Sequence, residues 1–524
     1  MLWEKGIELS ALYYSSDYML KSIDINKHIP VATVGQETRG DQLVNQEKLL
    51  EEGIEGKKVG QIHYFLRGTD GVSLQAQETA RFLQSVRAIT FDLAADVADK
   101  PLPELDYHSD RVVSLRNRMF DPSVDALTDE AKNNEEKILL QEIYEGAESI
   151  YTAFLEFIES NDLDIVHVRN LLSMPFLHIE AAVALERVIR DKPNIRFVLH
   201  HHDFYWEGPE SVKYVTHYPN IQHLADSLTA PNYPNTKHIC INTIAQQELL
   251  ERKGVTASYI PDGFDFDKQV MLMTAEQESE FKNRYGIKEN DLVLALTTRV
   301  RTNKGFQTAI EIAKTLGAQK NQLVDQQDGV GKQRKKFGVE NEIIVLVIQS
   351  ADFDESYYAQ IENYAKEQGV RLLYVGDSVV SDDRFTEQDA KDGKYSFYSI
   401  TQSAIIDAVL YVATHEGFGN QAIEAAWAKL LLVMFGYPVA IVDIFHHIDG
   451  IIKVGSMDDT SQWGDTELPI VNKDVVELAV DELISVLLNH ETEKQMVESA
   501  YEAFRSLCHI RTIGLKYLEI YLEN

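Results

Sequence analysis

The stretch IIDAVLYVATHEGFGNQAIEAA, residues 405–426, decides the fold of this chain. It opens with the apolar run Ile405 to Val412, which has the length of a strand, and it closes with a helical pattern. The glycine-rich turn 417–419 between them presents backbone N–H groups and the positive end of a helix dipole, which suit a diphosphate. Glu416 and Glu424 lie beside this turn and can accept hydrogen bonds from sugar hydroxyls. The pattern therefore predicts a site for a nucleotide sugar.

Short apolar strands alternate with helical stretches along the rest of the chain, in two series. This alternation predicts parallel sheets of the doubly wound type. The linker Ile260–Asp265, with Pro261 and Gly263, separates the two series. We therefore expect an α/β protein with two Rossmann-like domains that face each other across a cleft. The expected strands are 61–65, 165–168, 197–200 and 239–242 in the first series, and 292–297, 343–348, 371–375, 408–412 and 431–435 in the second.

The expected domain organisation has four parts. They are an N-terminal extension (1–58), a first Rossmann-like domain for the acceptor (59–262), a second for the nucleotide sugar (263–500), and a C-terminal helix (501–524) that packs back on the first domain. Two polar insertions interrupt the second series. Residues 318–341 are expected to form a mobile surface loop whose basic run is a solvated face. Residues 381–398 are expected to form a loop or the edge of a lid.

The composition limits the partners and the compartment. The 524 residues hold 50 Lys plus Arg against 83 Asp plus Glu, a net charge of −33. Such a charge argues against nucleic acid or an anionic membrane as a partner, and it requires local cations for any nucleotide sugar. Cys240 and Cys508 are the only cysteines, which fits a reducing cytoplasm. The chain shows no signal peptide and no apolar run of membrane-spanning length, so we expect a cytoplasmic protein that could form homo-oligomers.

A second loop carries the cations that the ligand requires. Arg299 and Lys304 lie between an expected strand and a helix that begins near Phe306. A guanidinium and an ammonium on one loop can neutralise a departing diphosphate. They could also be ordinary surface cations, but the glycine-rich turn in the same domain favours the first interpretation.

Three motifs resemble those of the retaining GT-B glycosyltransferases of family four, and they follow one another along the chain in the same order as in that family. Glu416 and Glu424 match the family's E-x7-E signature, Arg299 with Lys304-Gly305 is similar to its phosphate loop, and Ile260–Asp265 resembles its P-N-G-x-D linker. The resemblance covers residues 59–515. It implies that Glu416 contacts the donor sugar and Glu424 the ribose, although Glu424 could instead be an ordinary helix-surface acid. It also implies that Arg299 and Lys304 hold the diphosphate, and that the turn Gly417, Phe418, Gly419 and Asn420 binds the donor.

The first domain adds a second set of candidates. Gly68–Ser73 resembles the family's first glycine-rich loop, which makes Gly71 a donor-binding and Asp70 an acceptor-side residue; it lacks the GxGxxG spacing of dinucleotide binders. The family often places a histidine after the strand that here ends in three histidines, and His202 is the expected catalytic one. Neighbouring residues on a strand point to opposite sides, which argues against a zinc site made of all three. Asn170 is expected on the acceptor side.

The resemblance implies transfer of a hexose from a nucleoside-diphosphate sugar to a small hydroxylated acceptor, with retained configuration. A sugar, a sugar phosphate or a glycerate-like compatible solute fits the acceptor. No cofactor is expected and no metal is expected to be essential, because Arg and Lys meet the diphosphate charge. The chain departs from the family at Asp262 and Thr298, where the loops can differ in shape, and over Tyr437–Asp443, which leaves the acceptor class open. The sequence also does not identify the base or the sugar. A GT-B glycoside phosphorylase and a non-catalytic nucleotide-sugar binding protein are the alternatives.

Overall fold

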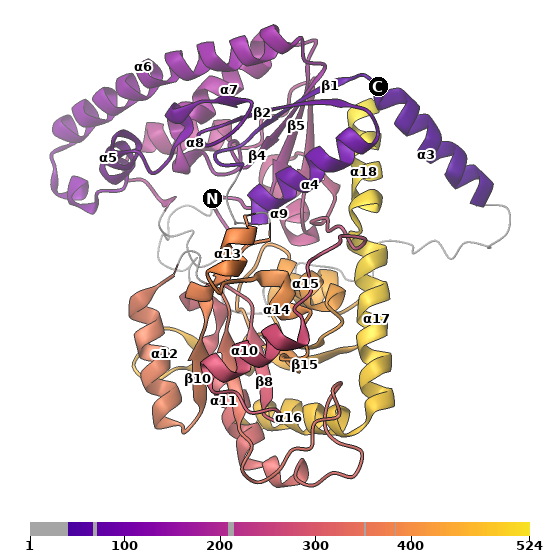
Figure 1. Ribbon diagram of the computed structural model, residues 1–524. Coiled ribbons are helices and arrows are strands. Elements are labelled where there is room, and N and C mark those ends of the chain that lie inside the picture. Colours follow the sequence, from indigo (N-terminus) through magenta and orange to yellow (C-terminus); the bar gives the residue numbers. More distant parts are fainter. Residues whose placement is uncertain (1–39, 67–70, 208–213, 350–352, 383, 524) are drawn as a thin grey trace. The chain divides into compact units, whose positions relative to one another are not determined.

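The chain folds into two compact units. A computed structural model describes residues 40–66, 71–207, 214–349, 353–382 and 384–523, with side chains from residue 47 onward. Within these residues the first unit runs up to Asp265 and resumes at His509, and the second unit spans Phe266–Cys508. The chain therefore enters the second unit just after the linker 260–265 and returns to the first unit for its last helix (Figure 1).

The first unit is built on a seven-stranded sheet in which every neighbouring pair of strands is parallel. The strand order is β3-β2-β1-β4-β5-β6-β7, so the chain reverses direction across the sheet between β1 and β4. This is the order of a Rossmann-like sheet. The strands are β1 (Lys58–Ile62), β2 (Ile89–Ala94), β3 (Lys100–Pro101), β4 (Ile165–Arg169), β5 (Arg196–His201), β6 (Thr236–Cys240) and β7 (Ser258–Tyr259).

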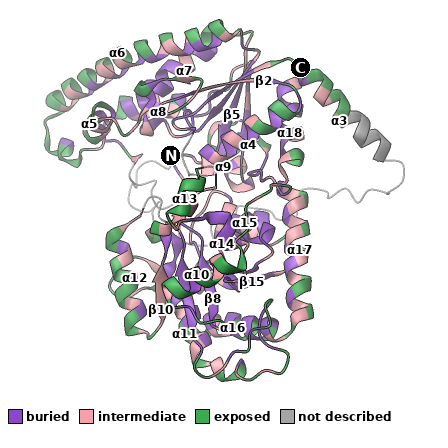
Figure 2. Ribbon diagram, viewed as in Figure 1, coloured by how far each residue is buried: buried purple, intermediate pink, exposed green. Residues whose placement is uncertain are grey.

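Helices cover both faces of this first sheet. Successive strand residues point to opposite faces, so Phe197 and Leu199 of β5 join one apolar cluster and Val198 joins the other. The first cluster lies under α5–α8 and the second under α4 and α18 (Figure 2). The helices are α3 (Gly40–Ile54), α4 (Gly71–Ser85), α5 (Asp110–Met119), α6 (Asp129–Asn161), α7 (Ile179–Asp191), α8 (Pro219–Leu228), α9 (Thr243–Lys253) and α18 (Ile510–Leu522).

The second unit repeats the same plan with a six-stranded parallel sheet of order β10-β9-β8-β13-β14-β15. Its five-residue strands β8 and β9 are buried along their whole length, which explains their continuous apolar sequence. The two sheets confirm the expected pair of Rossmann-like domains. The strands are β8 (Leu292–Leu296), β9 (Ile343–Val347), β10 (Arg371–Tyr374), β13 (Ala408–Tyr411), β14 (Leu431–Gly436) and β15 (Ile451–Ser456).

The helices of the second unit pack on one another as well as on the sheet. Helix α11 packs on α12 and α16, and α15 packs on α17. Two small two-stranded sheets, β11 with β12 and β16 with β17, lie outside the main sheet. The helices are α10 (Ala275–Tyr285), α11 (Phe306–Ala318), α12 (Glu355–Glu367), α13 (Glu387–Lys391), α14 (Phe397–Thr401), α15 (Asn420–Trp427), α16 (Lys473–Leu488) and α17 (His490–Cys508); the short strands are β11 (Val379–Val380), β12 (Tyr395–Ser396), β16 (Thr460–Gln462) and β17 (Pro469–Val471).

The insertion at 318–341 differs from the expected surface loop, because Leu323, Val330 and Phe337 are buried and Gly331 N donates to Leu487 O. Four residues of its basic run are exposed, but Lys335 is buried and its Nζ lies 2.7 Å from Oδ2 of the buried Asp407. Asp407 precedes β13 and also accepts a hydrogen bond from Val293 N. The prediction was wrong for Lys335, because the carboxylate beneath the sheet needs a buried counter-charge and the insertion supplies it.

The last stretch of the chain forms two successive helices, α17 and α18. Residue His509 separates them, and its Nδ1 accepts a hydrogen bond from Arg511 N. Helix α17 belongs to the second unit, and α18 packs on α3 and α4 of the first. Among the described residues, no helix combines the length and the apolar character needed to cross a membrane.

Candidate functional site

The candidate donor site lies at the point where the second sheet reverses its strand order. Strands β8 and β13 are neighbours there, and the chain leaves them toward opposite edges of the sheet. Ligands of such sheets bind outside the carboxyl ends of the two strands at this reversal. The loop after β8 carries Arg299 and Lys304, and the loop after β13 carries Glu416 and Gly419.

Hydrogen bonds hold these two loops together. Thr414 N donates to Asn303 O at 2.9 Å, and Asn303 Nδ2 donates to His415 O at 3.2 Å. Gly305 lies where the first loop comes close to the end of β13. It has a φ of 66°, and a Cβ at this position would lie 2.1 Å from Val412 O. Only glycine allows this close approach, so the motif Lys304-Gly305 has a structural reason as well as a chemical one.

Lys304 and Glu416 form an ion pair across the two loops. Lys304 Nζ lies 2.5 Å from Glu416 Oε1, and the two side chains are 7% and 16% exposed. An ammonium has three donors, so Lys304 can keep Glu416 and still bind a phosphate oxygen. Arg299 is half-buried near the start of the same loop. The structure therefore brings the predicted lysine and the first predicted glutamate into contact.

The glycine-rich turn is shaped by a tyrosine that the sequence did not single out as a site residue. Phe418 is buried, and its carbonyl oxygen accepts a hydrogen bond of 2.5 Å from Tyr437 Oη. Gly419 has a φ of 133°, and a Cβ there would lie 2.4 Å from the same hydroxyl. Helix α15 starts at Asn420, directly after Gly419, which has no side chain to cap it. The first N–H groups of α15 therefore keep their capacity to bind an anion.

Glu424 lies one turn further along α15 and is partly buried. Its Oε1 accepts a hydrogen bond of 2.9 Å from Tyr398 Oη, and burial raises the pKa of its carboxyl to about 7. Lys268 Nζ lies 4.6 Å from the centroid of the Tyr398 ring. Tyr398 is the last residue of the segment 381–398, which was expected to be a loop or the edge of a lid. The segment instead contains α13, β12 and the start of α14, on which Tyr398 lies. The sequence carried no signal for this contact, because the two residues are 26 positions apart in different elements.

In the loops after β8 and β13, three buried polar atoms have no hydrogen-bond partner among the described residues. Thr297 Oγ1 and Thr298 Oγ1 follow the strand directly, and both side chains are almost fully buried. Asn420 Oδ1, at the start of α15, is also without a hydrogen-bond partner among the described residues. A buried polar atom that is left unpaired is costly, so such atoms favour a polar ligand nearby.

In the first unit, Asn170 joins the ends of β4 and β5. It has a φ of 60°, and its Oδ1 accepts hydrogen bonds from His202 N (2.8 Å) and Asp203 N (3.2 Å). Burial lowers the pKa of His202 well below its ordinary value, with a further contribution from Arg169, so the imidazole is neutral at pH 7. His202 Nδ1 lies 3.5 Å from Asp262 Oδ1. The side chain of Asn170, which follows β4, thus bonds the backbone of His202, which follows β5, so the structure brings these two predicted residues together.

The three consecutive histidines point to different partners. His200 Nδ1 lies 3.1 Å from His167 Nε2, and His201 Nε2 lies 3.1 Å from His238 Nδ1. Their neighbour Arg169 is fully buried, donating to Gln61 Oε1 (2.7 Å) and Thr79 Oγ1 (2.8 Å). The sequence did not identify this arginine, because it is the last residue of an apolar strand.

The first glycine-rich loop is described only at its end. Gly71 is the first residue of α4, and Ser73 Oγ donates to Phe65 O at 2.7 Å. Asp70, the other candidate on this loop, lies outside the described residues.

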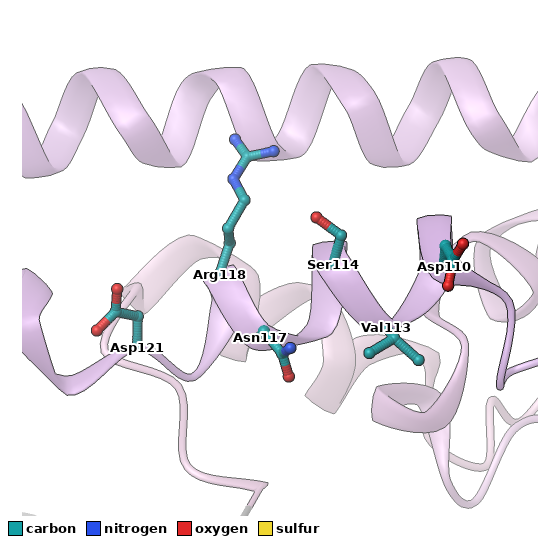
Figure 3. A pocket seen from close by; sticks show the side chains of 6 residues that line it. All are labelled: Asp110, Val113, Ser114, Asn117, Arg118 and Asp121. Atoms are coloured by element: carbon teal, nitrogen blue, oxygen red, sulfur yellow. The ribbon is translucent and has the colours of Figure 1, made fainter.

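A separate hollow of about 360 Å³ lies on helix α5 in the first unit (Figure 3). Its lining includes Asp110, Ser114, Asn117 and Arg118, and none of the predicted site residues. Arg118 points away from α5 and pairs with two glutamates of α6, so its charge is already met. This hollow is therefore not the candidate site.

Two proteins of known function align with most of the chain. The mannosylglucosylglycerate synthase of Petrotoga mobilis is 27% identical over 435 residues, which is 82% of this chain and 94% of that protein. The mannosylglucosylglycerate synthase of Thermotoga maritima is 25% identical over 452 residues, which is 85% of this chain and 95% of that protein. No protein-family model matches the chain.

Solved structures share the fold. The sucrose-phosphate synthase of Thermosynechococcus elongatus has a TM-score of 0.54 at 11% identity, covering 89% of this chain and 98% of its own. HepE of Anabaena, solved with UDP and glucose, has a TM-score of 0.53 at 13% identity, covering 88% and 99%. Together with the two parallel sheets, these likenesses confirm the expected GT-B fold.

Proposed function

We propose that this chain, which is a GT-B glycosyltransferase of the family-four-like group, moves a hexose from a nucleoside-diphosphate sugar to a small glycerate-containing acceptor with retention of configuration. The hexosyltransferase activity follows from the relatives, and the acceptor class from their names. The observation that carries the proposal is the Lys304–Glu416 ion pair beside the start of α15, at the strand reversal of the second sheet.

The proposed donor site assigns a role to each group. Lys304 and Arg299 balance the negative charge of the diphosphate, and the N–H groups at Gly419 and Asn420 bind its oxygens. Glu416 accepts hydrogen bonds from the hexose hydroxyls, and Glu424 accepts them from the ribose. HepE was solved with UDP and glucose, which are the two halves of such a donor.

The proposed acceptor side lies in the first unit, at the ends of β4 and β5. His202 is neutral there, so it can donate or accept one hydrogen bond to a sugar hydroxyl without adding charge. Asn170 fixes the backbone of His202 and thereby its position.

The proposed mechanism relies on positioning and on charge stabilisation. As the bond between sugar and diphosphate breaks, negative charge grows on the leaving oxygen, where Lys304 and the α15 N–H groups stabilise it. The acceptor hydroxyl then attacks from the same face, and the leaving phosphate oxygen takes its proton. We propose that no metal ion is needed, because the cationic side chains meet the diphosphate charge.

The test is to incubate the purified chain with UDP-, ADP- and GDP-hexoses and with glycerate or glucosylglycerate. Mass spectrometry of the product identifies the transferred sugar, and NMR of the anomeric proton reports its configuration. We expect a glycosylated acceptor and one equivalent of free nucleoside diphosphate. Product formed only from a sugar phosphate would favour the phosphorylase, and donor binding without any product would favour a binding protein.

A further inference from the structure

We propose that Tyr437 is a positioning residue that orients one peptide of the donor turn. Its hydroxyl holds the carbonyl of the Phe418–Gly419 peptide, so that the Gly419 N–H points away from the protein interior and toward the diphosphate. This inference rests on the proposed function and names a residue that completes its donor site. The residues 437–443 depart from the family pattern, so the role is a property of this chain.

The orientation follows from the geometry of a trans peptide. In such a peptide the C=O and the N–H point in opposite directions. Tyr437 is fully buried, and its Oη donates to Phe418 O at 2.5 Å, so the carbonyl faces the interior. The N–H of the same peptide belongs to Gly419 and must face the other way. Among the described residues, none accepts a hydrogen bond from this N–H.

The tyrosine is itself held firmly in place. Its ring meets the ring of Tyr411 edge to face, with 6.1 Å between the centroids. Its backbone oxygen accepts a hydrogen bond of 3.0 Å from Ile441 N, at the start of a π-helical turn over Ala440–Ile444. Such turns are rare and occur mainly at functional sites. The restrained hydroxyl of Tyr437 therefore fixes the orientation of the Phe418–Gly419 peptide.

The close contact also explains the glycine at 419. Any Cβ there would lie 2.4 Å from Tyr437 Oη, so with tyrosine at 437 only glycine fits at 419. Glycine alone would let the peptide rotate, because it tolerates many backbone conformations. The hydroxyl removes this freedom before the donor binds, and preorganised N–H donors are the most effective ones for developing charge.

The first test compares Tyr437→Phe with Tyr285→Phe. Tyr285 lies in the same unit and donates a similar hydrogen bond, 2.6 Å to Ser378 Oγ, away from the donor turn. We expect Tyr437→Phe to weaken the binding of the nucleoside diphosphate roughly 10-fold by calorimetry, since the freed Phe418–Gly419 peptide no longer holds the Gly419 N–H in place for its hydrogen bond to the charged diphosphate. The nucleoside alone should bind both variants equally, and kcat should fall more than the donor KM changes.

A second pair of variants separates orientation from packing. Tyr437→p-aminophenylalanine keeps a donor at the ring end, and Tyr437→p-methylphenylalanine keeps the volume without a donor. We expect the first to bind the nucleoside diphosphate like the wild type and the second to bind it like Tyr437→Phe. Equal affinity of these two variants would overturn the inference, even if Tyr437→Phe does not fold.

The inference and the proposed function fail in different ways. If the wild-type chain binds no nucleoside diphosphate, the proposed donor site is wrong. If the wild type binds it and all Tyr437 variants bind it equally, the donor site stands and the role of Tyr437 is wrong.

Discussion

Replacing Lys304 with methionine tests the centre of the donor site. The substitution keeps the length of the side chain and removes the ammonium, so Glu416 loses the partner that lies 2.5 Å away. We expect two separate effects. The folded protein loses stability because a largely buried carboxylate is left unpaired, and turnover falls because the leaving diphosphate loses a cation.

The structure sets the size of both effects. At an effective dielectric of ~20, two unit charges at this distance attract each other by about 7 kcal/mol, most of which offsets their desolvation. Removing one partner of a buried pair costs about 3–5 kcal/mol. For a unit of this size, 3 kcal/mol lowers Tm by roughly 6–12 °C. Loss of one group that stabilises transition-state charge lowers kcat about 10²- to 10³-fold.

A double variant separates the two effects. Lys304→Met with Glu416→Gln removes both charges, so the unpaired carboxylate disappears and most of the stability should return. The rate should stay low, because the cation is still missing and the carboxylate that binds the hexose is now missing as well. Calorimetric melting and steady-state kinetics on both variants and the wild type provide the two readouts. Normal turnover in Lys304→Met, or recovery of the rate in the double variant, would show that Lys304 serves only the structure.

Three further predictions concern other charged groups. Burial raises the pKa of Glu424 from 4.5 to about 7, so between these values the folded chain holds a proton that the unfolded chain has released, and stability falls as pH rises. The Tm of Glu424→Gln minus the Tm of the wild type should therefore increase from pH 5 to pH 8. A difference in Tm that does not change with pH would contradict the assignment. Lys335→Met should destabilise the chain by about 3–5 kcal/mol in urea unfolding, because Asp407 is left buried and unpaired, while the exposed Lys336→Met should have no effect. Addition of EDTA should leave turnover unchanged if Arg and Lys alone meet the diphosphate charge, and loss of activity that Mg²⁺ or Mn²⁺ restores would contradict the proposed metal-free mechanism.

The central strands of both sheets could be predicted because they are buried on both faces. Strands such as β8 and β9 contain almost only apolar residues, which is the strongest sequence signal for a parallel sheet. Among the strands nearer the sheet edges, β10 was predicted, but β2 and β15 were missed. β2 contains Asp92 and is half-exposed over most of its length, and β15 contains the exposed Lys453, so the apolar pattern is weak in both.

The donor site could be predicted in part for a geometric reason. Loops that follow parallel strands meet at one edge of the sheet, so the cations after β8 and the carboxylate after β13 were expected to be close. The partners that hold these groups could not be predicted. Tyr398, which bonds Glu424, and Lys335, which pairs with the buried Asp407, both come from polar insertions. In such segments a sequence pattern predicts exposure but not contacts.

The departures from the family pattern have a common physical consequence. In the family that the chain resembles, a glycine usually stands at the position of Thr298, and a glycine pair and a glutamate stand where this chain has residues 437–443. Each departure places a hydroxyl at or behind a loop of the donor site. Thr298 Oγ1 is buried without a hydrogen-bond partner among the described residues, whereas Tyr437 Oη is bonded to Phe418 O and restrains the glycine turn. A loop that is ordered before binding loses less conformational freedom when the ligand arrives, which leaves more of the interaction energy for affinity. The glycine turn should therefore change little on binding a nucleoside diphosphate. Amide hydrogen exchange at Thr414, whose N–H is already bonded to Asn303 O, should be equally slow with and without it, whereas Gly419 N–H, which has no acceptor among the described residues, should become slow only when the diphosphate is bound.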